Sequence, residues 1–300
     1  MQEFVENLME RLHFPVEARM AFRAADTAVG QLPSARREMA AAQAALFTGL
    51  DDESVNRLFG DLTSLAHRAG VHPYTLHLLF YMEASQGLLA RYRAGGFSED
   101  VFWNTTADLS YKVKECHEVY GIWGTFVAGW HADFFRMKRF GLGRLQFEIA
   151  AFDRPDYMRG GYTVRRGDRV YSLHIPSSGP LTRESCLDAY RRAYAFFRPD
   201  REDRPLWLMC ISWLLFPDNA QFFPHPSHIL DFAHDFDIID RHPLPTFSDG
   251  WRVFGGEWRK PPEQLPRRTS LQRAYVTWLQ NGGQTGYGVG MLCFDGRRIL

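Results

Sequence analysis

The sequence has few cysteines and no excess of charge of either sign. Its 300 residues include four cysteines, and no two of them form a C-x-x-C pair, which argues against a zinc ribbon and against a dense disulfide scaffold. Lysine and arginine together number 35, as do aspartate and glutamate. No overall attraction to nucleic acid or to an anionic membrane is therefore expected.

Long apolar runs and a targeting segment are also missing. The longest apolar runs, such as residues 207–216, are far too short to span a bilayer. The first residues include three glutamates and lack the basic start and the continuous apolar stretch of a signal peptide. We therefore expect a soluble, cytoplasmic protein that contacts neither nucleic acid nor membrane.

Aromatic residues, in contrast, are abundant. The chain has 24 Phe, 12 Tyr and 8 Trp in a sequence that is 45% hydrophobic, which predicts a folded protein with large aromatic cores. The length allows two domains. Residues 1–140 show apolar side chains at helical spacing, and strands then alternate with helices. We predict an α+β protein with a helical domain at 1–140 and a mixed α/β domain at 141–300, whose sheet is mainly antiparallel.

Local signals predict where several elements begin and end. Residues suited to N-capping precede four of the predicted helices, at Ser34, Asp51, Ser98 and Thr269. The aromatic, glycine-spaced residues 121–140 predict one helix, residues 251–254 a short strand, and residues 200–204 a charged loop. Residues 286–294 predict a final strand. Its alternating glycines follow a helix, so they do not form the dinucleotide-binding motif, which requires a strand before it and a helix after it.

Two segments with period-two alternation predict a pair of strands. Polar and apolar side chains alternate in residues 144–149 and 169–175, and glycines between them supply turns, which favours an antiparallel pair. This pairing puts Gln146, Glu148, Ser172 and His174 on one face. A carboxylate and an imidazole on one surface can form a proton-transfer site. A solvated face of an antiparallel sheet explains the same pattern equally well.

The second strand runs directly into a loop and a helix. The loop, residues 175–182, is rich in serine, glycine and proline, and Thr182 is a natural N-cap. Backbone N–H groups at such a junction can hold an anion such as a pyrophosphate, although many junctions of this kind bind nothing. Ser212, in the following apolar strand, lacks the flanking glycines of a nucleophile elbow. A hydrolase triad centred on it is therefore not expected.

Histidines and aspartates cluster at positions 225–242. Their spacing of three residues suggests metal ligands. On a helix, however, such a series turns steadily around the axis, so no face collects three ligands, and the motif H-E-x-x-H is absent. We therefore predict no metal site and keep a metal-dependent hydrolase only as a third hypothesis.

Several short motifs occur in a characteristic order along nearly the whole chain: FWNT at 102–105, ADL at 107–109, RLQFE at 144–148, HIPS at 174–177, SWLL at 212–215, and LQRA at 271–274 followed by Gly282-Gly283. In these motifs the chain resembles a bacterial family of acyltransferases that join a helical N-acyltransferase N-terminal domain to a GNAT-like C-terminal domain. The resemblance implies acyl transfer from acyl-coenzyme A to an amine, with the coenzyme beside the strand–loop–helix junction. The loop departs from the GNAT pattern, which is an arginine or glutamine, two variable residues, and then Gly-x-Gly or Gly-x-Ala.

The residues and the resemblance together predict an N-acyltransferase that uses acyl-coenzyme A as cosubstrate and a small-molecule amine as acceptor. Glu148 or His174 would take the proton from the attacking amine, since an ammonium cannot attack a thioester. The candidate cofactor-binding residues are Ile175, Ser177, Ser178, Gly179, Thr182 and Ser212. The second hypothesis is a non-catalytic binding module of the same fold, motivated by the unusual loop.

Overall fold

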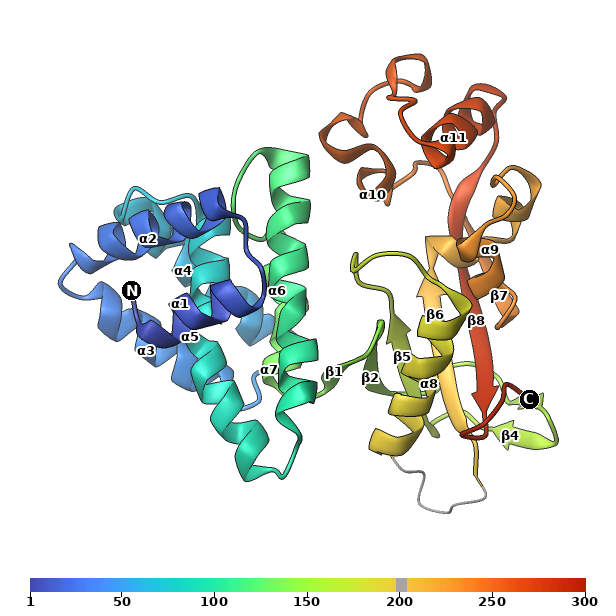
Figure 1. Ribbon diagram of the computed structural model, residues 1–300, viewed down its shortest axis with the longest axis horizontal. Helices are drawn as coiled ribbons and strands as arrows, with labels where there is room; N and C mark the ends of the chain where they lie inside the picture. Colours follow the sequence, from blue (N-terminus) through green and yellow to red (C-terminus); the bar gives the residue numbers. More distant parts are fainter. Residues whose placement is uncertain (198–203) are drawn as a thin grey trace. The chain divides into compact units, whose positions relative to one another are not determined.

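The computed structural model describes residues 1–197 and 204–300, so the charged loop predicted at 200–204 lies almost wholly outside the described residues. The described chain divides into two compact units, Met1–Gly141 and Leu142–Leu300. The first unit is helical and the second combines a sheet with helices (Figure 1). The predicted α+β class is therefore confirmed.

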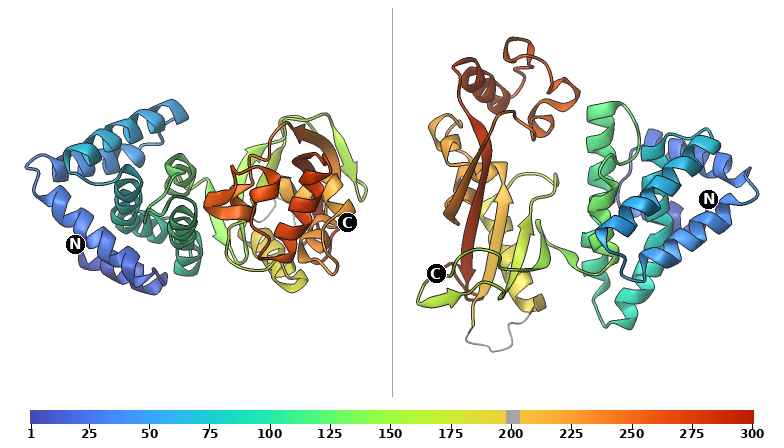
Figure 2. Two further views of the ribbon diagram at one scale, coloured as in Figure 1. Left: turned by 90° about the horizontal axis from the view of Figure 1, so that it is seen from above. Right: turned by 180° about the vertical axis from the view of Figure 1, so that it is seen from behind.

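The first unit is built from seven helices, all within the described residues. They are α1 (Glu3–Arg11), α2 (Val16–Gly30), α3 (Ala35–Leu46), α4 (Asp52–Arg68), α5 (Pro73–Ala94), α6 (Glu99–Tyr120) and α7 (Ala128–Phe135). Helix α5 is its centre. Every residue of α5 from Thr75 to Ser85 is buried, as expected of a helix that neighbours surround on all sides. Helices α1, α2, α3, α4, α6 and α7 all contact it, and Figure 2 shows it inside the helical unit.

Three of the four predicted N-caps are confirmed. The side chains of Asp51, Ser98 and Thr269 each accept a hydrogen bond from a backbone N–H in the first turn of the helix that follows. The prediction for Ser34 is wrong. Its backbone is helical, and its hydroxyl donates to the Glu38 carboxylate at 2.6 Å, so it does not accept from the backbone.

The single helix predicted for residues 121–140 is also wrong in extent, because only Ala128–Phe135 is helical. Gly121 ends α6 in the left-handed conformation with φ 71°. Gly124 then lies so close to α5 that a Cβ atom there would be 2.3 Å from the carbonyl carbon of Tyr74. The loop after α6 therefore packs against the first turn of α5, where the Thr125 N–H donates to the Tyr74 carbonyl.

The second unit carries the sheet. Its elements, with the strand that leads into it, are β1 (Arg139–Leu142), β2 (Leu145–Ala151), β3 (Tyr157–Arg159), β4 (Tyr162–Val164), β5 (Arg169–His174), α8 (Arg183–Phe197), β6 (Leu206–Ser212), α9 (His228–Ala233), β7 (Asp237–Leu244), α10 (Trp251–Phe254), α11 (Ser270–Gln280) and β8 (Thr285–Phe294). The main sheet has the order β1-β2-β5-β6-β8-β7, and β3 and β4 form a separate ribbon. The pairs β2–β5, β6–β8 and β7–β8 are antiparallel, and β5–β6 is parallel.

Each face of the sheet has its own cover. Helix α8 lies on one face, where Phe197 stacks against Tyr171 and Tyr190 contacts Phe294. The β3–β4 ribbon covers part of the other face. There Tyr157 packs against Trp207, within a core cluster formed by Phe152, Val164, Val170, Trp207, Met209, Val289, Met291 and Cys293.

The alternating glycines of β8 serve close packing. A Cβ atom at Gly288 would lie 2.2 Å from the carbonyl oxygen of Leu215, and one at Gly286 would lie 2.2 Å from that of His242. Leu215 belongs to a short 3₁₀ turn, Trp213–Leu215, that follows β6. Gly288 thus allows this turn to pack directly on β8, and Gly286 allows the close approach of β7.

Two local predictions near the C-terminus are wrong. Residues 251–254 form the short helix α10, because four residues cannot distinguish a strand from a helical turn by periodicity, and Phe254 packs into a second core cluster that includes Tyr275. The histidine and aspartate series at 225–242 does not follow one helix. Helix α9 ends at Ala233 and the chain is extended from Asp237 onwards.

Candidate active site

A carboxylate and an imidazole meet on the exposed part of the sheet. The antiparallel register pairs Glu148 with Ser172 and Gln146 with His174, so these four side chains share a face, as predicted. His174 Nε2 lies 2.9 Å from Glu148 Oε2, and both side chains are about one-fifth exposed. When Nε2–H donates to the carboxylate, Nδ1 of the neutral ring holds the lone pair that can take a proton.

The parallel pair β5–β6 separates next to His174. Within the described residues its register covers only Tyr171–Leu208 and Ser172–Met209, although β6 remains paired with β8 as far as Ser212. Ile211, in an inner strand, is consequently 47% exposed. Beyond these two register pairs, the backbone edges of β5 and β6 are available to a ligand that can lie between two strands.

Arg144 fixes the loop that follows β5. Its guanidinium donates to the carbonyl oxygens of Pro176, Gly179 and Pro180 at 2.9, 2.6 and 3.2 Å. Gly179 has φ +116°, a conformation that favours glycine. Sequence reasoning placed Arg144 on the polar side of the strand and did not connect it to the loop, since no local signal shows which carbonyls a distant arginine will reach.

The candidate phosphate-binding residues lie along the same junction. Thr182 caps α8 by accepting a hydrogen bond from the Ser185 N–H at 3.3 Å, so the positive end of a 15-residue helix faces the loop. The hydroxyl oxygen of Ser178 is buried and has no hydrogen-bond partner among the described residues. A buried hydroxyl in that state is suited to an acceptor such as a phosphate oxygen.

The remaining candidates border this junction. Ile175 follows His174 at the end of β5 and is half-buried, and Ser177 is exposed. Ser212 ends β6, and its hydroxyl accepts the Leu214 N–H at 3.2 Å, which starts the 3₁₀ turn. Ser212 therefore has a structural role as the residue that caps this turn.

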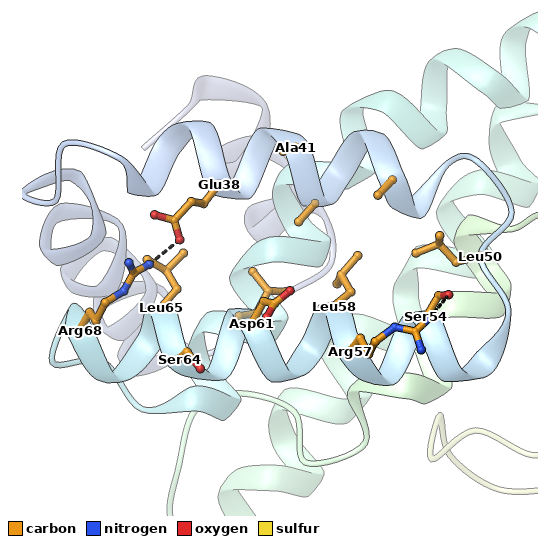
Figure 3. A pocket seen from close by; sticks show the side chains of 13 residues that line it. Glu38, Ala41, Leu50, Ser54, Arg57, Leu58, Asp61, Ser64, Leu65 and Arg68 are labelled. Carbon is orange, nitrogen blue, oxygen red and sulfur yellow. Dashed lines mark hydrogen bonds and ion pairs between the residues drawn. The ribbon is translucent and has the colours of Figure 1, made fainter.

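A separate groove lies in the helical unit between α3 and α4 (Figure 3). It has a volume of about 740 Å³ and an apolar floor of alanines and leucines. Its lining residues, all of them described, include no histidine. The Glu38 carboxylate on one side is paired with Arg68 on the other, and Arg57 is paired with Glu53. The groove therefore offers apolar surface but no imidazole, and its carboxylates are those of Glu38 and Asp61.

No described group of three or more histidine, cysteine, aspartate or glutamate side chains is arranged to hold a metal ion. In the described chain, no helix combines the length and apolar character needed to cross a membrane.

The second unit has a mixed sheet in which a parallel pair of strands separates beside a strand–loop–helix junction. This arrangement is that of the class of GNAT-like folds. The chain belongs to the family with a GNAT-like C-terminal domain, whose family model matches residues 140–292. Residues 3–137 match the N-acyltransferase N-terminal domain. The resemblance to this two-domain family is therefore confirmed. None of the curated proteins matches the chain.

Solved structures share the whole fold. The crystal structure of an acyltransferase in complex with decanoyl-CoA and teicoplanin has a TM-score of 0.74 and 21% identity, and the match covers 98% of this chain and 88% of that one. The crystal structure of a mutant acyltransferase in complex with octanoyl-CoA has a TM-score of 0.74 and 22% identity, with the same coverage of both chains. The crystal structure of an acyltransferase in complex with decanoyl-CoA has a TM-score of 0.71 and 24% identity, and the match covers 96% of this chain and 86% of that one. At this identity the likeness shows a common fold.

Proposed function

We propose that this protein transfers an acyl group from acyl-coenzyme A to a small-molecule amine, with His174 as general base and Glu148 as the residue that orients it. The observation that carries the proposal is the 2.9 Å contact between these two side chains, on the sheet face where β5 leaves β6. The family of the chain, and the acyl-CoA ligands of proteins with the same fold, support the choice of donor.

The junction after β5 fits the coenzyme. Ser178 offers a buried hydroxyl that has no hydrogen-bond partner in the described part of the chain, and the amides at the start of α8 lie at the positive end of the helix dipole. Arg144 adds a cation next to the loop. Ser177, Ser178, Gly179 and Thr182 would hold the pyrophosphate, and Ile175 and Ser212 would flank the arm that lies between the separated strands. When bound, coenzyme A supplies the activated thioester.

Glu148 and His174 have different roles in proton transfer. Glu148 accepts from Nε2–H, which orients the ring and stabilises the imidazolium once it forms. Nδ1 of His174 takes a proton from the acceptor's ammonium group, directly or through a water. The neutral amine then forms a bond to the thioester carbonyl carbon as the carbon–sulfur bond breaks. The bonded nitrogen loses its second proton to solvent and His174 returns its own proton to the leaving thiolate, so the products are an amide, free coenzyme A and one released proton.

The test is release of free coenzyme A thiol from octanoyl- or decanoyl-CoA in the presence of a panel of primary amines. His174→Asn is expected to lower kcat at least ~100-fold while titration with coenzyme A gives an unchanged Kd. Ser172→Ala, on the same strand and face, serves as the matched control and keeps its turnover. Full turnover in His174→Asn would remove this residue from the mechanism. Binding of acyl-CoA without turnover on any amine would favour the non-catalytic binding module.

A further inference from the structure

A second carboxylate–imidazole pair lies on the same sheet face as the first. On β7, His242 Nε2 is 2.8 Å from Asp240 Oδ2, and both side chains are about one-third exposed. The His242 ring also stacks on Tyr287 of β8, with ring centroids 4.6 Å apart and planes at 16°. Carboxylate and tyrosine thus hold this imidazole as firmly as Glu148 holds His174.

The strand registers place the two pairs in one row across the sheet. Asp240 pairs with Val289, and Val289 pairs with Ile211. Ser172 pairs with Met209, so His174, two residues further along β5, points to the same face as Ile211. The row therefore runs from His174 over Ile211 and Val289 to Asp240. It crosses three strand spacings, which amount to about 14 Å, and because β5 and β6 separate next to His174 the row is at least this long.

The surface between the two pairs is partly open and apolar. The β3–β4 ribbon covers the part of this face around Trp207 and Met291. Val289, in the middle of the row, is fully buried in the same core cluster. Further along the strands, Ile211 is 47% exposed and Tyr287 is half-buried, so the open surface passes over these two side chains. An extended ligand can lie there with an apolar or aromatic middle part over Ile211 and Tyr287, and with a polar group at each end.

The charges at the second pair select the kind of polar group. Asp240 accepts from His242 and also from Arg154 Nη1 at 3.1 Å, so its negative charge is already matched by a cation. The hydrogen bond from His242 keeps the pKa of the Asp240 carboxyl below its usual range, and the group is ionised at neutral pH. With Nε2–H directed to Asp240, His242 Nδ1 is a hydrogen-bond acceptor. The nearby guanidinium disfavours an ammonium ligand, so a neutral hydroxyl is the better donor.

We propose that this row is the acceptor-binding surface, and that His242, oriented by Asp240 and Tyr287, accepts a hydrogen bond from a hydroxyl group carried at least about 14 Å from the reacting amine. The inference rests on the proposed function, because it takes the amine to be at His174. It identifies the acceptor class as an elongated amino alcohol or aminophenol with an apolar middle part.

The experiment compares two amines of equal length with decanoyl-CoA as donor. One is a terminal amino alcohol of ten carbons, whose extended length covers the three strand spacings of the row, and the other is the ten-carbon amine without the hydroxyl. The wild type is expected to show a KM about fivefold lower for the amino alcohol, the effect of one net hydrogen bond. His242→Phe keeps a ring to stack on Tyr287 and should abolish this preference, so that the KM for the amino alcohol rises to that for the plain amine. A four-carbon amino alcohol should show no preference over its amine, since it cannot span the row.

Arg241→Gln is the matched control, since the Arg241 side chain pairs with Asp218 and lies over Phe216. It should keep the preference for the long amino alcohol. Equal KM values for both ten-carbon amines in the wild type would overturn the proposal, and so would a preference that persists in His242→Phe.

Titration of both ten-carbon amines into the protein without donor separates this inference from the proposed function. If neither amine is acylated, yet the amino alcohol binds about fivefold more tightly and His242→Phe removes the difference, the binding surface stands and the catalytic proposal fails. If the amino alcohol binds no more tightly than the amine, the acceptor-binding surface is overturned whatever the turnover.

Discussion

Arg144 donates a hydrogen bond of 2.6 Å to the carbonyl oxygen of Gly179, and the same guanidinium reaches the carbonyls of Pro176 and Pro180. One planar cation thus fixes three carbonyl oxygens of a loop that has no regular secondary structure. A guanidinium has five donors in a rigid fork, and an ammonium has three on a flexible stem. The loop therefore owes its conformation to a residue more than thirty positions earlier in the chain, immediately before β2.

This relationship predicts that Arg144 affects cofactor binding more than chemistry. Arg144→Ala should raise both the KM for acyl-CoA and the Kd for coenzyme A about tenfold, because the loop loses three hydrogen bonds and the site loses a nearby cation. Arg144→Lys should recover only part of the loss, and kcat should remain nearly constant. Titration with coenzyme A and steady-state kinetics measure both effects.

The matched control is Arg166→Ala, which removes an exposed arginine from the turn before β5. It should leave the Kd unchanged. Equal Kd values for Arg144→Ala and the wild type would show that the loop keeps its form, or that coenzyme A binds elsewhere.

The sequence predicted those parts of the site that depend on strand periodicity. The pairing of Glu148 with His174 follows from alternation in two strands, because the period of two fixes which side chains share a face. The Arg144 contacts could not be predicted, since they depend on the path of a loop that has no periodicity.

The pair Asp240–His242 was missed for a related reason. Both positions fall in the segment 225–242, whose histidines and aspartates were considered only as metal ligands on a helix, where positions two apart point in different directions. In the structure they lie on β7, where positions two apart share a face. The bulge between Ile238 and Asp240 then sets which residues of β7 face Val289 and Tyr287.

Glu148→Gln is expected to lower kcat about tenfold while the KM for acyl-CoA stays constant. Glutamine keeps the size of the side chain and an oxygen that can accept from His174 Nε2–H. It lacks the negative charge that stabilises the imidazolium, so the orientation of the ring is retained and its ability to take a proton is reduced. Initial rates at saturating donor measure the change. A rise in KM with an unchanged kcat would instead assign Glu148 to substrate binding.

The four cysteines should not react with a thiol reagent in the folded protein. All four are buried and free, and burial raises the pKa of Cys116 and Cys293 to about 12 and that of Cys186 to about 11. The thiolate is the reactive form, so we expect no labelling at neutral pH and labelling of all four after denaturation. Coenzyme A release can then be followed with the same reagent. Rapid labelling of the native protein would contradict the buried positions.

A positive control for this labelling lies in the loop. Ser177 is exposed, so Ser177→Cys should react readily. Acyl-CoA should protect it if the loop holds the pyrophosphate, and undiminished labelling in saturating acyl-CoA would place the cofactor elsewhere.

His77 should make the helical unit sensitive to acid. Its side chain is 8% exposed, and burial lowers the pKa of this imidazole from 6.5 to about 4. Thr63 Oγ1 donates to the Phe59 carbonyl and lies 3.0 Å from His77 Nε2, so the neutral ring donates to this hydroxyl. Between about pH 6.5 and pH 4 the unfolded chain binds a proton at His77 that the folded chain does not. The free energy of unfolding should therefore fall as the pH falls through this window, by up to about 3 kcal/mol.

Urea unfolding followed by far-ultraviolet circular dichroism across this pH range measures the effect. His77→Phe removes the titrating group and keeps an aromatic ring beside Phe59, which His77 contacts edge-on at 5.1 Å. Its stability should depend less on pH than that of the wild type, and the difference between the two proteins should grow only below about pH 6.5. His67→Gln, at an exposed position of α4, should retain the wild-type dependence. Parallel stability curves for the wild type and His77→Phe would show that His77 takes up its proton equally in the folded and unfolded chains, against the burial that the structure gives it.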